Sequence, residues 1–199
     1  MTDIPVLQIV GYKNSGKTTL IENLVRHLKE TSEIRIAVIK HHKGTFPFDK
    51  EGKDTWKYRQ AGASAAAIQS PGMLALSMDH QQEKTLAELI GVFRALGHFE
   101  LILVEGYKWE AYPKAVLIRN REDFAELSAC ASVCLYVFEK QTDYDDYMKR
   151  ENPGIPALLR SDEAGLTAWV RRLLPVQNLI CSPDERGSMM IKDMKHYTG

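Results

Sequence analysis

The sequence lacks the features of secreted, membrane-spanning and disulfide-stabilised proteins. It has only three cysteines in 199 residues, and an odd number without dense spacing does not indicate a disulfide framework. No apolar run approaches the ~18 residues that a membrane-spanning helix requires. The N-terminal segment, MTDIPVLQIVG, has no cationic stretch before a long apolar run, so it does not resemble a secretory signal. We therefore expect a cytoplasmic protein that does not associate with a membrane.

The chain also lacks an excess of either charge. It has 26 basic residues (Lys and Arg) and 26 acidic residues (Asp and Glu), which give a formal net charge of zero at pH 7. A general nucleic-acid binder needs a basic surface to hold phosphates, so we expect no nucleic-acid partner. The length and a hydrophobic content of 44% are typical of one globular domain. We assign residues 1–181 to this domain and expect residues 182–199 to form a polar, disordered tail.

Hydrophobic periodicity predicts strands that alternate with helices. Short apolar runs predict strands at 6–10, 34–39, 101–104, 115–118 and 133–138, and helical spacing predicts helices at 17–30, 54–61, 85–96 and 162–174. Two further runs around a Ser-Pro-Gly turn predict a β-hairpin over 65–78. The charged, proline-containing segment 142–156 is expected to be a loop. This alternation is typical of the α/β class, and we predict a mostly parallel, mixed sheet with an added hairpin.

One segment carries a specific phosphate-binding pattern, the Walker A motif. Residues 11–18 read GYKNSGKT and match G-x-x-x-x-G-K-[ST] in full, between a predicted strand and a predicted helix. In such a P-loop, glycines let backbone N–H groups point at phosphate oxygens, and the helix adds its positive N-terminal end. We expect Lys17 to reach the β- and γ-phosphates and Thr18 to ligate Mg²⁺. The predicted nucleotide-binding residues are Gly11, Asn14, Ser15, Gly16, Lys17, Thr18 and Thr19.

The predicted strand before the Walker A motif and the predicted helix after it indicate the three-layer fold of P-loop NTPases. The alternative is a glycine-containing turn that matches the pattern by chance.

A P-loop protein also needs a carboxylate that holds Mg²⁺. The run LILVEG puts Glu105 at the end of a predicted strand, and ligands of open α/β sheets bind outside the carboxyl ends of strands. We predict that Glu105 is a metal ligand and, with Lys17, a catalytic residue; the alternative is a loop carboxylate without a role.

The loop after the second strand, residues 40–54, should face the same crevice. Its basic residues Lys40, His41, His42 and Lys53 are predicted to form a switch-like loop beside the triphosphate. Asp49 and Asp54 are predicted to contact Mg²⁺ directly or through water. The alternative is a solvated charged loop.

Four segments of the chain resemble the molybdopterin-guanine dinucleotide biosynthesis protein B (MobB) family, within the P-loop GTPase class. They are GYKNSGKTTL, VIKHHKGTFPFDKEGKDTWKYRQAGA, LILVEGYK and PKAVLIR. The resemblance implies binding of GTP with Mg²⁺, slow GTP hydrolysis and a homodimer. It also implies an adaptor that assists the molybdopterin guanylyltransferase, or that helps deliver the finished cofactor to molybdoenzymes.

Two questions stay open at this point. No N/T-K-x-D motif for reading guanine is evident, and Asp162 either contacts the base or caps the last predicted helix. The same P-loop would also serve an ATP-dependent small-molecule kinase, whose mobile lid needs arginines such as Arg119 and Arg121. A third alternative is an interaction protein with an inactive P-loop. No water-positioning glutamine or arginine finger is evident, which predicts slow turnover.

Overall fold

The computed structural model describes residues 4–44, 46, 49–79, 82–149 and 154–175. Strands and helices follow one another as β1 (Val6–Val10), α1 (Lys17–Thr31), β2 (Ile36–Lys40), α2 (Asp54–Gln60), β3 (Ala65–Ser70), β4 (Met73–Met78), α3 (Leu86–Leu96), β5 (Leu101–Glu105), β6 (Lys114–Ile118), α4 (Arg121–Leu127), β7 (Val133–Phe138), α5 (Gln141–Met148), β8 (Ala157–Leu159) and α6 (Glu163–Arg171). The predicted tail, 182–199, lies outside the described residues. Among these residues, no helix has the length and apolar character needed to cross a bilayer.

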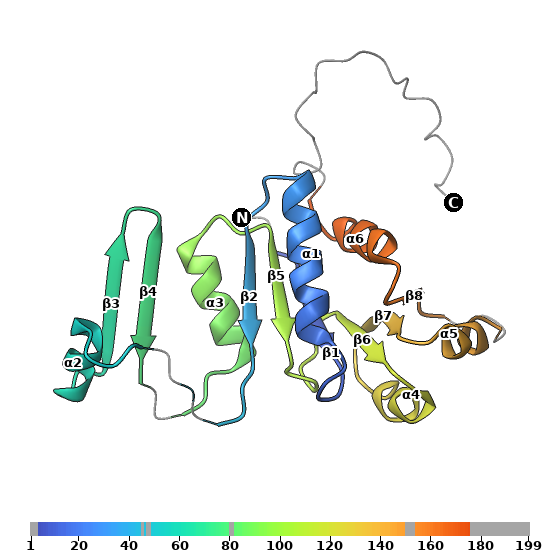
Figure 1. The fold of residues 1–199 in the computed structure, drawn as a ribbon, viewed down its shortest axis with the longest axis horizontal. Coiled ribbons are helices and arrows are strands. Elements are labelled where there is room, and N and C mark those ends of the chain that lie inside the picture. The colour runs from blue at the N-terminus through green and yellow to red at the C-terminus, as the bar shows by residue number, and fades with distance from the viewer. Residues whose placement is uncertain (1–3, 45, 47–48, 80–81, 150–153, 176–199) are drawn as a thin grey trace, which may run out of the picture.

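The main sheet has six strands in the order β2-β5-β1-β6-β7-β8, and all of its pairs are parallel. Every residue of β1 is buried, as expected for a strand of a parallel sheet that is covered on both faces. The carboxyl ends of the strands therefore meet at one edge of the sheet, which is the lower edge in Figure 1. The predicted α/β class is confirmed.

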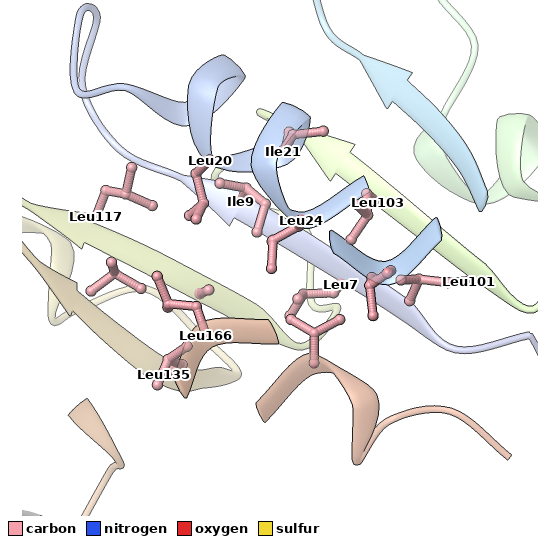
Figure 2. Close-up of a cluster of buried hydrophobic side chains, with 14 of the residues drawn as sticks. Leu7, Ile9, Leu20, Ile21, Leu24, Leu101, Leu103, Leu117, Leu135 and Leu166 are labelled. Atoms are coloured by element: carbon pink, nitrogen blue, oxygen red, sulfur yellow. The ribbon is translucent and has the colours of Figure 1, made fainter. Parts of the chain in front are cut away.

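Helices cover both faces of this sheet, which makes the three-layer fold. Helices α1 and α6 pack on one face, where Leu24 and Leu166 contact a layer of buried strand side chains. Figure 2 shows this layer, with Leu7, Leu103 and Leu135 beneath the two helices. Helices α3, α4 and α5 cover the other face through two further buried clusters. Because the strand side chains are buried on both faces of the sheet, the ends of the strands are fixed in position. The loops of the candidate site begin at these strand ends.

The predicted hairpin forms, but it is not part of the main sheet. Strands β3 and β4 pair only with each other, as an antiparallel two-stranded sheet. The hairpin and α2 stand apart from the main sheet at one end of the molecule (Figure 1). Arg59 of α2 is hydrogen-bonded to Ser77 and Asp79, which fixes α2 to the hairpin. The main sheet is thus parallel throughout the described residues and not mixed, because the two hairpin strands satisfy each other.

Three elements differ from the sequence-based prediction. The segment 142–156 is not wholly a loop, since α5 occupies its first half, and α4 and β8 were not predicted. Tyr147 explains α5: it is buried against Phe124 and Phe138, and its hydroxyl donates to the Ile155 carbonyl at 2.8 Å. Tertiary packing therefore stabilises a helix whose own sequence is a poor helix former.

Candidate nucleotide-binding site

The P-loop lies between β1 and α1, as predicted, and its backbone is bent by left-handed residues. Asn14 has a φ of 62° and Gly16 a φ of 81°. Gly16 is the N-cap of α1 and no side chain caps this end, so the first N–H groups of the helix are open to an anion. A Cβ at Gly11 would lie 2.5 Å from Ser15 Oγ, so a larger residue there would displace the Ser15 side chain. The positive φ at Gly16 and the close approach at Gly11 favour glycine at both positions of the loop.

Lys17 folds back over this loop. Its Nζ donates to the Tyr12 carbonyl at 2.6 Å. Burial lowers the pKa of Lys17 below its ordinary value, and Glu105 opposes that shift. The positive charges of Lys40 and Arg119 lower it further. Several cations thus converge near the loop, which favours a polyanionic ligand.

Glu105 ends β5 next to the P-loop, where the sequence predicts it. Its Oε2 accepts a hydrogen bond from the Thr18 hydroxyl at 3.0 Å and lies 3.2 Å from Lys40 Nζ. Gln8 of β1 donates to the carbonyls of Gly106 and Tyr107 at 3.2 and 2.7 Å, which fixes the turn that follows Glu105. The predicted pair of Thr18 and Glu105 is therefore brought together.

This pair of oxygen ligands fits Mg²⁺. Magnesium is usually held by one or two carboxylates together with substrate phosphates and waters, and less often by an all-protein cage. The described residues contain no cluster of three or more His, Cys, Asp or Glu side chains that could hold a metal. Thr18 and Glu105 would hold the ion, which would neutralise phosphate charge.

The loop over 40–54 is divided between two regions. His41 Nε2 lies 2.8 Å from Glu83 Oε1, its ring lies 4.7 Å from the Tyr107 ring, and its backbone N–H donates to the Glu105 carbonyl at 3.0 Å. The ring of His42 packs edge-on against Phe46. Lys40 and His41 thus lie at the ends of β2 and β5, and their role in a switch-like loop stays a prediction.

The acidic residues of that loop lie elsewhere. Asp49 lines a small cavity against the hairpin with Thr55 and Ala66. Asp54 begins α2 and pairs with Lys57 at 3.6 Å, and Lys53 is the N-cap of that helix. In the part of the chain described, the structure does not bring Asp49 or Asp54 into a metal-binding group with Glu105. Their role as metal ligands stays a prediction.

A groove of about 730 Å³ opens beside Lys40. Its lining includes basic and aromatic side chains together, namely Lys40, His41, His42, Lys43, Phe46, Lys84, Phe93 and Tyr107. Lys84 is paired with Glu88, which completes the capping box at the start of α3. The groove thus joins the end of β2 to α3 and the base of the hairpin.

Two arginines also contact the P-loop, and the sequence did not identify these contacts. Arg119 follows β6, lies over the Tyr12 ring at 5.5 Å and donates to the Lys13 carbonyl at 3.5 Å. Arg160 follows β8 and donates to the Ser15 carbonyl at 3.4 Å. A Cβ at Gly16 would lie 2.4 Å from the Arg160 guanidinium carbon. A positive φ at Gly16 and this close approach leave little room for a larger residue.

Each of these arginines is paired with a carboxylate. Asp123 accepts from Arg119 Nε at 2.6 Å and from Nη2 at 2.9 Å, and Glu139 lies 3.9 Å from Arg160 Nη1. Asp162 follows Arg160 closely and caps α6, because its Oδ1 accepts from the Gly165 N–H at 2.8 Å. The helix-cap alternative for Asp162 is thus realised, while a contact with a base stays a prediction.

The chain is similar in sequence and in fold to known proteins. Residues 6–138 match the model of the family described as molybdopterin guanine dinucleotide synthesis protein B, MobB. The chain is 34% identical over 160 residues to the probable molybdopterin-guanine dinucleotide biosynthesis adapter protein of Bacillus subtilis, covering 79% of this chain and 87% of that one. It is 35% identical over 120 residues to the adapter protein of Escherichia coli, covering 60% and 68%. The crystal structure of Bacillus subtilis MobB aligns with a TM-score of 0.68 at 30% identity, over 87% of this chain and 99% of that one.

Proposed function

The chain belongs to the MobB family, and from this premise we propose that it is a GTP-binding adapter in the biosynthesis of molybdopterin guanine dinucleotide. The observation that carries the proposal is the contact between Thr18 and Glu105 beside a complete P-loop. The adapter role is supported by the relatives, which are described as adapter proteins of this biosynthesis. The partner expected on this basis is the molybdopterin guanylyltransferase, or a factor that delivers the cofactor to molybdoenzymes. We place this activity in the cytoplasm.

The nucleotide would be held mainly by its phosphates. Lys17 and the loop amides would bind the β- and γ-phosphates. Thr18 and Glu105 would hold Mg²⁺, which supplies charge neutralisation between the phosphates. Asp162 would contact the base.

Hydrolysis should be slow in the isolated protein. Phosphoryl transfer depends on a positioned water and on an arginine that stabilises the transition state. Arg119 and Arg160 contact the P-loop backbone, but Asp123 holds Arg119 by hydrogen bonds and Glu139 lies 3.9 Å from Arg160. We therefore expect GTP turnover far below the ~10 s⁻¹ typical of enzymes.

A homodimer is the second part of the proposal, with the hairpin as its arm. Leu74, Leu76 and Met78 alternate along β4 and are all more than half exposed. An apolar strand face that is open to water is typical of an interface. Strand β2 ends the main sheet, and such an edge is a template for pairing. A second copy of the chain that packs here would cover the apolar face of β4 and the free edge of β2.

The test is a titration of the full chain with GTP and with ATP by calorimetry, each with Mg²⁺. Tighter binding of GTP is expected. Tighter binding of ATP, together with ATP consumption in the presence of an acceptor, would instead support the kinase alternative. The absence of binding of either nucleotide would contradict a nucleotide-dependent function altogether.

The adapter role needs a separate assay. The protein, with GTP and Mg²⁺, is added to a guanylyltransferase reaction that contains molybdopterin. Faster or more complete formation of the dinucleotide cofactor is expected, and a Lys17→Ala variant should lose this effect. No effect of the wild-type protein on the yield would count against the role.

A further inference from the structure

Lys40 occupies an unusual position for a basic side chain, directly at the candidate metal ligand. It is the last residue of β2 and is the register partner of Glu105 across the β2–β5 ladder. Its Nζ lies 3.2 Å from Glu105 Oε2, the oxygen that also accepts the Thr18 hydroxyl. The Glu105 side chain is only 13% exposed. An ammonium group thus neutralises the Glu105 carboxylate.

The same ammonium is close to the phosphate end of the P-loop. The charge of Lys40 acts on Lys17, whose pKa it helps to lower. Lys17 is the residue expected to reach the terminal phosphates. A γ-phosphate held there would bring further negative charge within reach of Lys40, and a lysine on a four-carbon stem can change its partner by rotation alone.

The backbone around Lys40 is held in place, while about half of its side chain is exposed to solvent. The N–H of His41 donates to the Glu105 carbonyl at 3.0 Å, and the ring of His41 is held by Glu83 and Tyr107. The Lys40 side chain itself is 53% exposed. A change of partner therefore requires no movement of the strand end.

We propose that Lys40 makes the site specific for the triphosphate over the diphosphate. With a diphosphate, the Lys40 ammonium stays on Glu105 and competes there with the metal ion. With a triphosphate, the ammonium donates to a γ-phosphate oxygen and leaves Glu105 to the ion. The inference rests on the proposed nucleotide site and adds to it the residue that reads the γ-phosphate.

The experiment compares Lys40→Ala with Lys43→Ala, a matched variant in the same loop. Lys43 is exposed and lines the groove, whereas the lysine that pairs with Glu105 is Lys40. Affinities of wild type and variants for GDP and for the nonhydrolysable analogue GMPPNP are measured by calorimetry with saturating Mg²⁺. The Mg²⁺ concentration that half-saturates the GDP complex is measured in the same proteins.

Lys40→Ala should weaken GMPPNP binding by about ten- to hundredfold, the value of a charge-assisted hydrogen bond. GDP binding should change much less, and the GDP complex should need less Mg²⁺, because a competing cation has been removed. Lys43→Ala should alter neither property. If Ala disturbs the end of β2, as judged by a lowered melting temperature, Lys40→Met keeps the stem and should give the same pattern.

Equal losses of GDP and GMPPNP affinity in the Lys40 variants would overturn the inference. They would show that Lys40 attracts any nucleotide phosphate and does not distinguish the γ-phosphate. An unchanged GMPPNP affinity would overturn it as well. Both results leave the proposed function intact, since the wild-type protein still binds nucleotide. Only the absence of nucleotide binding in the wild type would remove the site itself.

Discussion

The hydroxyl of Thr18 donates to Glu105 Oε2 at 3.0 Å, which joins the P-loop to the end of the neighbouring strand. This contact results from the strand order, because β1 and β5 pair in parallel and end at the same edge of the sheet. A hydroxyl and a carboxylate at this distance are a suitable pair for a hard cation.

Glu105→Gln should weaken Mg²⁺-dependent nucleotide binding. The amide keeps the shape of the side chain but loses its charge, so we expect about a ten- to hundredfold loss of GTP affinity with Mg²⁺ and a small change in EDTA. Calorimetry under the two conditions measures this difference. Glu100→Gln is the control, since Glu100 lies at the opposite end of β5 and accepts from the Arg35 N–H. Equal effects with and without Mg²⁺ would rule out a role at the metal.

Lys17→Ala should abolish triphosphate binding. The side chain is held at the Tyr12 carbonyl and would exchange this neutral acceptor for phosphate oxygens, a stronger charge-assisted contact. Lys13→Ala, an exposed position in the same loop, controls for the general loss of a positive charge. The assay is equilibrium binding of a fluorescent GTP analogue, and unchanged affinity in the Lys17 variant would refute the site.

The sequence predicts the parts of this site that follow strong local signals. Glu105 follows a fully apolar run, and Lys17 lies in a complete motif. The contacts of Arg160 could not be predicted, because β8 has only three residues and Ser15 lies 145 positions away. The pairing of Lys40 with Glu105 depends on β2 being next to β5, and periodicity does not determine strand order. The hairpin was predicted from its turn, but its separation from the main sheet depends on tertiary packing.

The pair of Arg119 and Asp123 should make stability depend on acid pH. The hydrogen bonds from Arg119 lower the pKa of Asp123 below its ordinary value, and its side chain is only 5% exposed. A lowered folded-state pKa contributes stability above the unfolded-state value of 3.8, and this contribution is lost as the pH falls through the folded-state pKa.

Asp123→Asn should therefore lower the free energy of unfolding at pH 7 by about 1–3 kcal/mol. It should also reduce the decline in stability below about pH 4. Urea denaturation between pH 3 and 7 measures both effects. The control is Asp54→Asn, whose carboxylate is 81% exposed. Parallel pH profiles for wild type and the Asp123 variant would contradict the assignment.

The apolar face of the hairpin should carry the dimer contact, and Met78→Lys tests it. Met78 is 54% exposed on β4, and a lysine there would have to be buried without a partner when a second copy packs on this face. We expect the dissociation constant to rise at least about tenfold, equivalent to 1.4 kcal/mol, as measured by analytical ultracentrifugation. Met148→Lys makes the same change at a site 45% exposed on α5, at the far end of the molecule from the hairpin (Figure 1), and it should leave the dimer unchanged. A wild-type protein that is monomeric at micromolar concentration, or equal effects of the two lysines, would show that the hairpin does not form the interface.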